Sequence, residues 1–354
     1  MKEKKEAGKI SISQIVLVFF SLAFLIFYLF WVDGVSALPL LLNIQYAKYI
    51  FLAAACMLLY WLSEGVVLYL SLRSSSVSLP FFSVFRITMI GQYFNVVTPF
   101  SAGGQPSQAY YLHKKGISYS QAVSGLFSKF LIYQLTLTVY CLCMVLLRFT
   151  VFREEYGSLV YMSLIGFAVQ VGVSFALLSI AFFKKGTTAV ISFVFRFLGK
   201  FKIFRKITEK KANVFSEIES FHEQCMMTFR DKKRLFLSFL MTVVQLSAYY
   251  VIGYLLHLCF RQDSVDFLTI ISSQTFIVLI GSFIPTPGGV GTAEGSFYLF
   301  FQTYFPSSVL SLVIFLWRAL TFYFPLLTGL FFVITEKRKN LKTRGVLLSE
   351  DGVK

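Results

Sequence analysis

Long apolar runs recur along this chain, and they limit its fold more than any other feature. Each run holds about 20 residues or more, the length at which a helix spans a hydrocarbon core about 30 Å thick. Barrel strands would instead be alternating segments of about ten residues. The sequence therefore predicts an all-α polytopic membrane protein with about six full transmembrane helices. The predicted spans are 13–32, 47–70, 118–147, 159–183, 235–260 and 308–335.

The composition supports this class. Hydrophobic residues make up 56% of the 354 residues and charged residues 14%, whereas a soluble domain is about 25% charged. That much apolar surface cannot be hidden in a water-soluble core of this size. A soluble enzyme, a secreted disulfide scaffold and a disordered chain are excluded.

Two further apolar segments, 80–97 and 267–284, each lead into a Thr-Pro pair followed by Gly-Gly. Each segment is followed by a long helix with one embedded cation. Lys129 lies 30 residues after the first Thr-Pro proline, and Arg318 lies 31 residues after the second. We interpret the segments as two re-entrant helical hairpins in an inverted repeat, an arrangement that many transporters use.

Lys and Arg residues gather between the apolar runs and give a net charge of +16. This predicts cytoplasmic loops rather than a nucleic-acid binder. With both termini cytoplasmic, 26 of the 33 basic residues lie inside, four outside and three in the membrane. The predicted organisation is a single transmembrane domain over 1–335, with repeat one at about 47–147, a basic amphipathic region at 184–234, repeat two at about 235–335, and a cytoplasmic tail at 336–354.

Two parts of the basic region have an amphipathic pattern. Residues 189–207 interleave aromatic and basic side chains, which fits either an interfacial helix on anionic lipid or an ordinary positive-inside loop. Residues 213–229 repeat apolar residues at helical spacing and predict a second amphipathic helix packed on the membrane side of the protein.

The helix breaks are the first group of candidate binding residues. Gly and Pro there free backbone N–H and C=O groups, which must line a polar cavity or be buried in protein. Free N–H groups at such a break can bind an anion. Turns in short extramembrane loops are the alternative. The candidates for substrate binding are Asn95, Thr98, Gly103, Gly104, Gln105, Thr286, Gly288 and Gly289.

Ionisable residues within the spans form the second group. Lys129 and Arg318 each fall about 15–18 Å along a helix, near the centre of the membrane, where a charge needs polar partners. Glu294 is the expected partner of Arg318 or Lys129, in a lipid-binding site or in a purely structural salt bridge. Further possible site residues are Glu64 and Arg86, which could instead extend to the cytoplasmic surface, and Tyr133 and Gln134, which could instead pack helices.

Catalytic and metal-binding patterns are weak. The five cysteines form no CxxC pair, the three histidines are scattered, and no Ser-His-Asp set is present. We therefore expect no catalytic residue, no metal site and no cofactor.

Three motifs carry a resemblance to a known family: 91–112 (GQYFNVVTPFSAGGQPSQAYYL), 284–294 (IPTPGGVGTAE) and 317–329 (WRALTFYFPLLTG). Here the chain resembles the lysylphosphatidylglycerol synthase transmembrane-region family, also described as a flippase-like domain. In that family the first loop often carries an acid and the next helix an Arg, whereas this chain has Gln105 and Lys129.

The resemblance implies a function. Two-part members join this domain to a soluble domain that transfers an aminoacyl group to phosphatidylglycerol, and this chain stops about 20 residues after its last span. The expected function is translocation of anionic or aminoacylated phospholipid in a bacterial-type cell membrane, which contributes to cationic antimicrobial peptide resistance. A lysyltransferase-related enzyme and an accessory subunit of a separate synthase are the alternatives. The expected partners are phospholipid, the bilayer, and a separate synthase or a second copy of the chain, with no nucleic acid.

Overall fold

A computed structural model gives the fold for most of the chain. The predicted span at 13–32, the amphipathic stretch at 189–207 and the second Pro-Gly break at 285–289 lie outside the described residues. The structure describes residues 44–74, 77–98, 101–157, 159–184, 186, 211–260, 265–281 and 291–350, without the side chains at 44–46, 155–156, 159, 211–218, 281 and 339–350.

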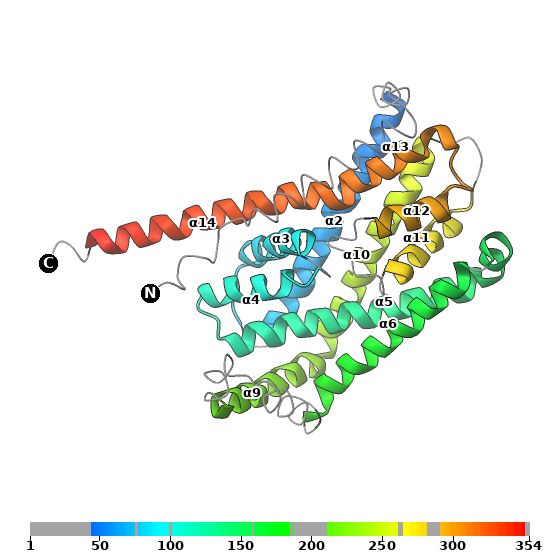
Figure 1. The fold of residues 1–354 in the computed structure, drawn as a ribbon. Helices are drawn as coiled ribbons and strands as arrows, with labels where there is room; N and C mark the ends of the chain where they lie inside the picture. Colours follow the sequence, from blue (N-terminus) through cyan, green and yellow to red (C-terminus); the bar gives the residue numbers. More distant parts are fainter. Residues whose placement is uncertain are drawn as a thin grey trace, which may run out of the picture. The chain divides into compact units, whose positions relative to one another are not determined.

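Every regular element in the described part of the chain is helical (Figure 1). Five of these helical segments are long and apolar enough to cross a membrane. They coincide with five of the six predicted spans, and the protein is a multi-pass membrane protein whose described elements are all helices. The candidate spans are Ala47–Ser74, Tyr119–Glu154, Val160–Phe182, Lys232–Cys259 and Ser307–Arg338.

The helices fall into two compact units, which are described separately. The Lys129 unit comprises Leu58–Thr88 and Gln105–Tyr249. The Arg318 unit comprises Met1–Met57, Met89–Gly104 and Tyr250–Lys354. The division passes through α2, α3 and α10, so each of these helices contributes to both units.

The Lys129 unit is built around α5. Its core is formed by apolar side chains from the ends of α2 and α4, the first half of α3 and the start of α5, among them Leu72, Val84, Leu112 and Leu126. Burying these side chains stabilises the unit, because each removes apolar surface from water. The helices of this unit are α2 (Ile44–Ser74), the first part of α3 (Phe81–Val97), α4 (Gly104–Lys114), α5 (Tyr119–Tyr156), α6 (Leu159–Phe182), α9 (Lys211–Arg230) and most of α10 (Lys232–Cys259).

Local sequence explains where α5 begins. Ser118 caps the helix, because its side chain accepts from the Gln121 N–H while the Gln121 side chain accepts from the Ser118 N–H. This reciprocal pair satisfies two backbone donors that a helix start leaves open.

The α9 helix packs on α5, as the amphipathic pattern at 213–229 predicts. Ser124 donates to Gln224 at 2.8 Å, and the rings of Phe127 and Phe221 lie 5.1 Å apart. Cys225, on the same face of α9, is fully buried. The second amphipathic helix is therefore confirmed.

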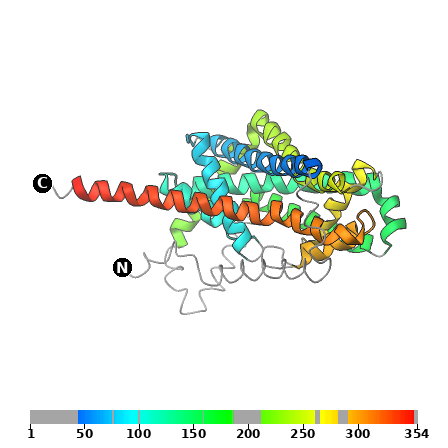
Figure 2. The ribbon, with the colours of Figure 1, turned by 90° about the horizontal axis from the view of Figure 1, so that it is seen from above.

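The Arg318 unit contains a second helical hairpin and a long interrupted helix. Its remaining elements are α11 (Phe267–Gly281), α12 (Thr292–Phe301), α13 (Ser307–Arg318), the π-helix η4 (Ala319–Tyr323) and α14 (Phe324–Glu350). The segments α13, η4 and α14 follow one another without a loop (Figure 2).

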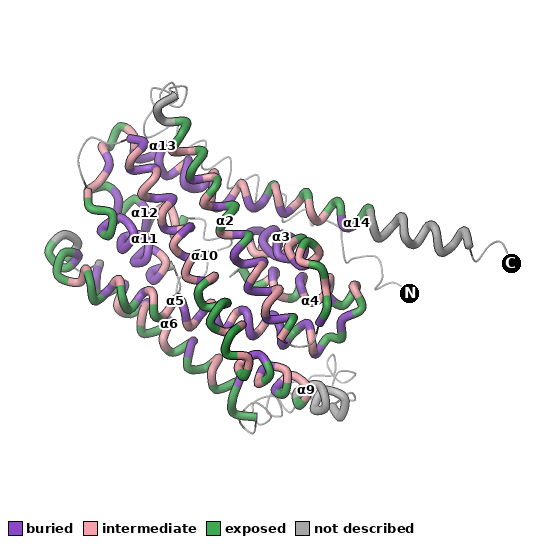
Figure 3. Tube along the Cα trace, turned by 180° about the vertical axis from the view of Figure 1, so that it is seen from behind, coloured by how far each residue is buried: buried purple, intermediate pink, exposed green. Residues whose placement is uncertain are grey.

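Burial differs between the helices (Figure 3). From residue 269 to 280, α11 is buried at every position except one that is half-buried. A helix buried on all sides lies inside protein. Much of α6 is exposed, including Ile165 and Phe175, as expected of a helix that faces lipid.

The second half of α3 packs against the long helix. Tyr93, Val96 and Val97 form a cluster with Phe322 and Leu326. The two backbones approach closely at Gly329, where an added Cβ would lie 2.7 Å from the Met89 carbonyl oxygen. Only a residue without a side chain fits there.

Candidate functional site

The break between α3 and α4 is a tight turn closed by its own polar side chains. Thr98 Oγ1 accepts a hydrogen bond from the Gly103 N–H at 2.8 Å and donates to the Phe94 carbonyl at 2.5 Å. An added Cβ on Gly104 would lie 2.0 Å from Asn95 Oδ1. The structure thus brings four predicted site residues together at one turn. There, Thr98 satisfies backbone groups that the break frees.

After the turn, α4 runs back beside α3. The Gln108 amide nitrogen donates to the Thr88 carbonyl at 3.5 Å, which joins the two helices well below the turn. Gln105, the predicted residue that stands where the family often has an acid, is half-buried in the first turn of α4.

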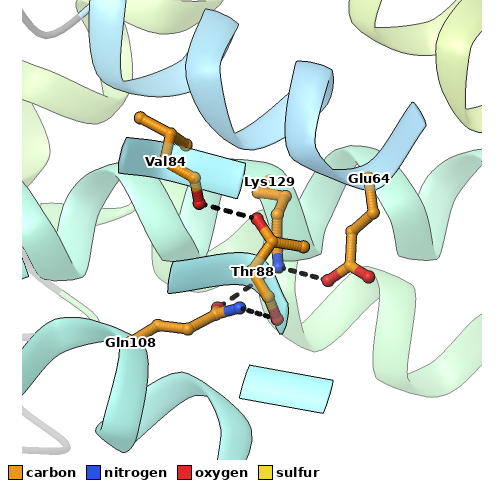
Figure 4. A network of polar contacts seen from close by, with 5 residues as sticks. All are labelled: Glu64, Val84, Thr88, Gln108 and Lys129. Carbon is orange, nitrogen blue, oxygen red and sulfur yellow. Dashed lines mark hydrogen bonds and ion pairs between the residues drawn. The ribbon is translucent and has the colours of Figure 1, made fainter. Parts of the chain in front are cut away.

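Lys129 is the centre of a buried network in the Lys129 unit (Figure 4). Its ammonium group donates to Glu64 Oε1 at 2.8 Å and to Gln108 Oε1 at 3.3 Å. The Lys129 and Glu64 side chains are only 11% and 9% exposed. Thr88, whose carbonyl accepts from Gln108, directs its own hydroxyl to the Val84 carbonyl at 3.2 Å.

This network joins α2, α3, α4 and α5. Glu64 belongs to the interior of the protein, where its charge is compensated by Lys129. The sequence did not predict Gln108 as a site residue. It lies three residues after Gln105, and nothing in the sequence shows whether such a glutamine is buried between two helices or exposed to solvent.

The Arg318 unit holds a second buried ion pair. Arg318 Nε lies 2.6 Å from Glu294 Oε1, and the two side chains are 7% and 16% exposed. The Gly291 N–H donates to Glu294 Oε2 at 2.8 Å. The expected pairing of Glu294 with Arg318 is confirmed, and both carboxylate oxygens have a donor.

Aromatic rings surround the guanidinium group. Its central carbon lies 4.9 Å from the Phe322 ring centroid and 5.7 Å from that of Trp317. The Trp317 ring in turn lies 4.9 Å from the Phe297 ring. Arg318 is the last residue before η4, and π-helical turns frequently occur at functional sites.

Arg318 keeps one hydrogen-bonding group available. Within the part of the chain that the structure describes, Arg318 Nη2 and the neighbouring Trp317 Nε1 are buried and have no hydrogen-bond partner. Arginine usually binds a carboxylate through two parallel N–H groups. Here the second oxygen of Glu294 accepts from the Gly291 N–H, so Nη2 of Arg318 has no acceptor among the residues that the structure describes and can bind another one.

Of the other predicted residues, Tyr133 is half-buried on α5 and close enough to Glu64 to interact with its charge. Arg86 is exposed on α3, and Gln134 is buried on α5. Thr286, Gly288 and Gly289 fall in the segment 282–290, outside the described residues. Among the described residues, no group of three His, Cys, Asp or Glu side chains could hold a metal ion.

The fold and the two ion pairs define a polytopic helical membrane protein with broken helices and compensated charges inside its apolar core. The chain belongs to the lysylphosphatidylglycerol synthase TM region family, whose pattern matches residues 14–329.

A relative supports the same class. The chain is 24% identical over 290 residues to a UPF0104 membrane protein of Archaeoglobus fulgidus, and this match covers 77% of the chain and 80% of the relative. No solved structure matches the chain.

Proposed function

We propose that this protein is a lipid translocase that binds the phosphate of an anionic or aminoacylated phospholipid headgroup at Arg318. The observation that carries the proposal is the Nη2 of a buried arginine, which has no hydrogen-bond partner among the described residues. A buried donor without an acceptor is unfavourable, and a phosphate oxygen, like a carboxylate oxygen, forms a strong charge-assisted hydrogen bond with a guanidinium group. Lysylphosphatidylglycerol is the lipid that the family description favours.

Glu294 sets the charge balance of this site. It partly neutralises Arg318, so that the guanidinium group can remain in an apolar interior without a ligand. A phosphate bound at Nη2 is attracted by the arginine but lies near the Glu294 carboxylate. The repulsion between these two anions weakens the binding, so that the phosphate can also be released. Such reversible binding is what a translocase needs.

The proposed membrane arrangement places the α3–α4 hairpin as a re-entrant element that opens to the cytoplasm and the α11–α12 hairpin as its inverted counterpart. Six full spans and two cytoplasmic termini in a bacterial-type cell membrane complete it. The turn around Gly116 should then be cytoplasmic, and the turn around Thr303 should face the outside. Single-cysteine labelling at these two turns in intact cells tests this arrangement, and equal labelling of both would overturn it.

Translocation is tested in vesicles with leaflet-selective detection of labelled phosphatidylglycerol and lysylphosphatidylglycerol. The purified chain should speed their redistribution, and R318Q should slow it by about tenfold or more, because a charge-assisted hydrogen bond contributes about 1.5–3 kcal/mol. R318Q leaves the Glu294 carboxylate without its cation, and R318Q/E294Q removes that unpaired charge. R153Q, which changes an exposed arginine on α5, is the matched control. Wild-type rates equal to those of empty vesicles would refute the proposal.

Resistance to cationic peptides is the proposed cellular consequence. A translocase that brings aminoacylated lipid to the outer leaflet lowers the negative surface charge there, which weakens the attraction of cationic peptides. Cells that carry R318Q should therefore become more sensitive than cells that carry R153Q.

A further inference from the structure

One turn of α11 is polar although most of the helix is apolar. Ser272, Ser273, Gln274 and Thr275 are all fully buried. The hydroxyls of Ser273 and Thr275 donate to carbonyl groups one turn earlier, at 2.9 and 3.1 Å, and their donors are thereby satisfied within the helix. Such bonds are the usual solution for a buried hydroxyl in a helix.

The Gln274 side chain makes no such hydrogen bond to a carbonyl group of the described helix. Its side chain is 0% exposed, and neither its amide nitrogen nor its amide oxygen has a hydrogen-bond partner in the described chain. A buried amide that makes no hydrogen bond loses its contacts with water and gains nothing in return. Nearly all such groups in proteins are paired with protein or with ordered water.

The neighbouring helix provides space for this amide. An added Cβ on Gly253 of α10 would lie 2.4 Å from Gln274 Nε2 and 3.2 Å from its Cδ. The two helices also meet where the rings of Tyr254 and Phe267 lie 4.8 Å apart. The glycine therefore leaves the room that the Gln274 amide occupies against α10.

The chemistry of an amide restricts what can bind it. The oxygen needs a donor and the nitrogen needs an acceptor, so the complementary group must do both. A hydroxyl group does both, whereas an inorganic cation can bind only the oxygen and a phosphate dianion only the nitrogen.

We infer that Gln274 forms a second, neutral binding site that holds one hydroxyl-bearing molecule, either water or a small polyol, between α10 and α11. This site is separate from the Arg318 pair. α11 meets α12 where Phe276 lies 6.0 Å from Phe300, and Glu294 lies six residues, or about 9 Å, further along α12. The inference does not depend on the proposed lipid function.

The sign of a stability change tests the inference. In the purified full-length chain, Q274M replaces the amide with an apolar side chain of similar shape, and L279M changes a buried apolar residue of α11 as the control. If a bound molecule satisfies the amide, Q274M loses those hydrogen bonds and its unfolding midpoint falls below that of L279M. If the site is dry, the midpoint of Q274M rises, and the inference is overturned.

A second pair of variants covers the case in which Q274M does not fold. Q274N keeps a donor and an acceptor, whereas Q274L has the same branching and the same number of side-chain heavy atoms as asparagine and neither group. We expect Q274N to be the more stable of the two, and equal or greater stability of Q274L overturns the inference.

Glycerol and sucrose distinguish the two sources of the hydroxyl. Both cosolutes stabilise proteins by exclusion from their surface, but only glycerol is small enough to enter such a site. An additional glycerol-dependent shift in wild type that Q274M lacks identifies a polyol, and equal shifts in both proteins identify water. Binding of short-chain phosphatidylglycerol is measured alongside, because loss in R318Q and retention in Q274M separates the two sites.

Discussion

The ion pair of Lys129 and Glu64 gives a prediction that can be worked from its geometry. At an effective dielectric constant of about 20, unit charges 2.8 Å apart attract by about 6 kcal/mol. Both groups have lost most of their water, since their side chains are 11% and 9% exposed. The desolvation penalty therefore cancels much of the attraction, and the intact pair contributes little net stability.

Replacing one partner of the pair changes the unfolding free energy differently from replacing both partners. K129M leaves the Glu64 carboxylate buried without its cation, and E64L leaves Lys129 with only the Gln108 oxygen at 3.3 Å. Each single variant should lose about 3–5 kcal/mol of unfolding free energy. The double variant K129M/E64L carries no uncompensated charge and should recover most of that loss.

A double-mutant cycle measures this coupling. Reversible unfolding of the purified chain in mixed micelles gives the four free energies, and the exposed pair of Lys184 and Glu219 provides the control cycle, in which we expect little coupling. Single variants that each cost under about 1 kcal/mol and simply add would show that water reaches the pair, which contradicts the burial argument.

Three other predictions concern local contacts. G104A places a Cβ 2.0 Å from Asn95 Oδ1 and should lower stability by about 1–3 kcal/mol, with recovery in an N95A background; additive losses would contradict this contact. G329A meets a backbone carbonyl at 2.7 Å and should lower the thermal midpoint even further, because the backbone cannot turn aside. Lys184 donates a hydrogen bond to Glu219 and lowers the pKa of that carboxyl. Wild type should therefore have a higher unfolding free energy than E219Q at neutral pH, and this difference should disappear as the pH falls below about 4. A difference that grows in acid would refute the assignment.

Much of the fold follows from the spacing of apolar residues. The long runs predicted five of the observed spans, because helix length is fixed by the thickness of a membrane. The pairing of Glu294 with Arg318 could also be predicted, because a charge at mid-membrane needs a partner and few carboxylates are available.

Other features depend on information that the sequence does not contain. Glu64 lies close enough to a helix end to reach water, and only the rotation of α2 directs it to Lys129 instead. Thr98 looked like a ligand group, yet closing the turn between α3 and α4 needs the same polar atoms that a ligand would use. Gln274 shows no sequence pattern, since its burial arises from the packing of α11 on its neighbours.

The π-helix after Arg318 affects two features of one continuous helix: the direction of the guanidinium group and the direction of the α14 packing face. The wider π turn holds one more residue than a regular α-helical turn. The direction of the guanidinium group relative to the α14 packing face therefore differs from what a regular α-helix of this sequence would give. If the five residues of η4 adopted the regular α-helical repeat instead, Arg318 would turn by about 100° relative to α14. The rotational phase of this helix is therefore part of the architecture that aims the arginine.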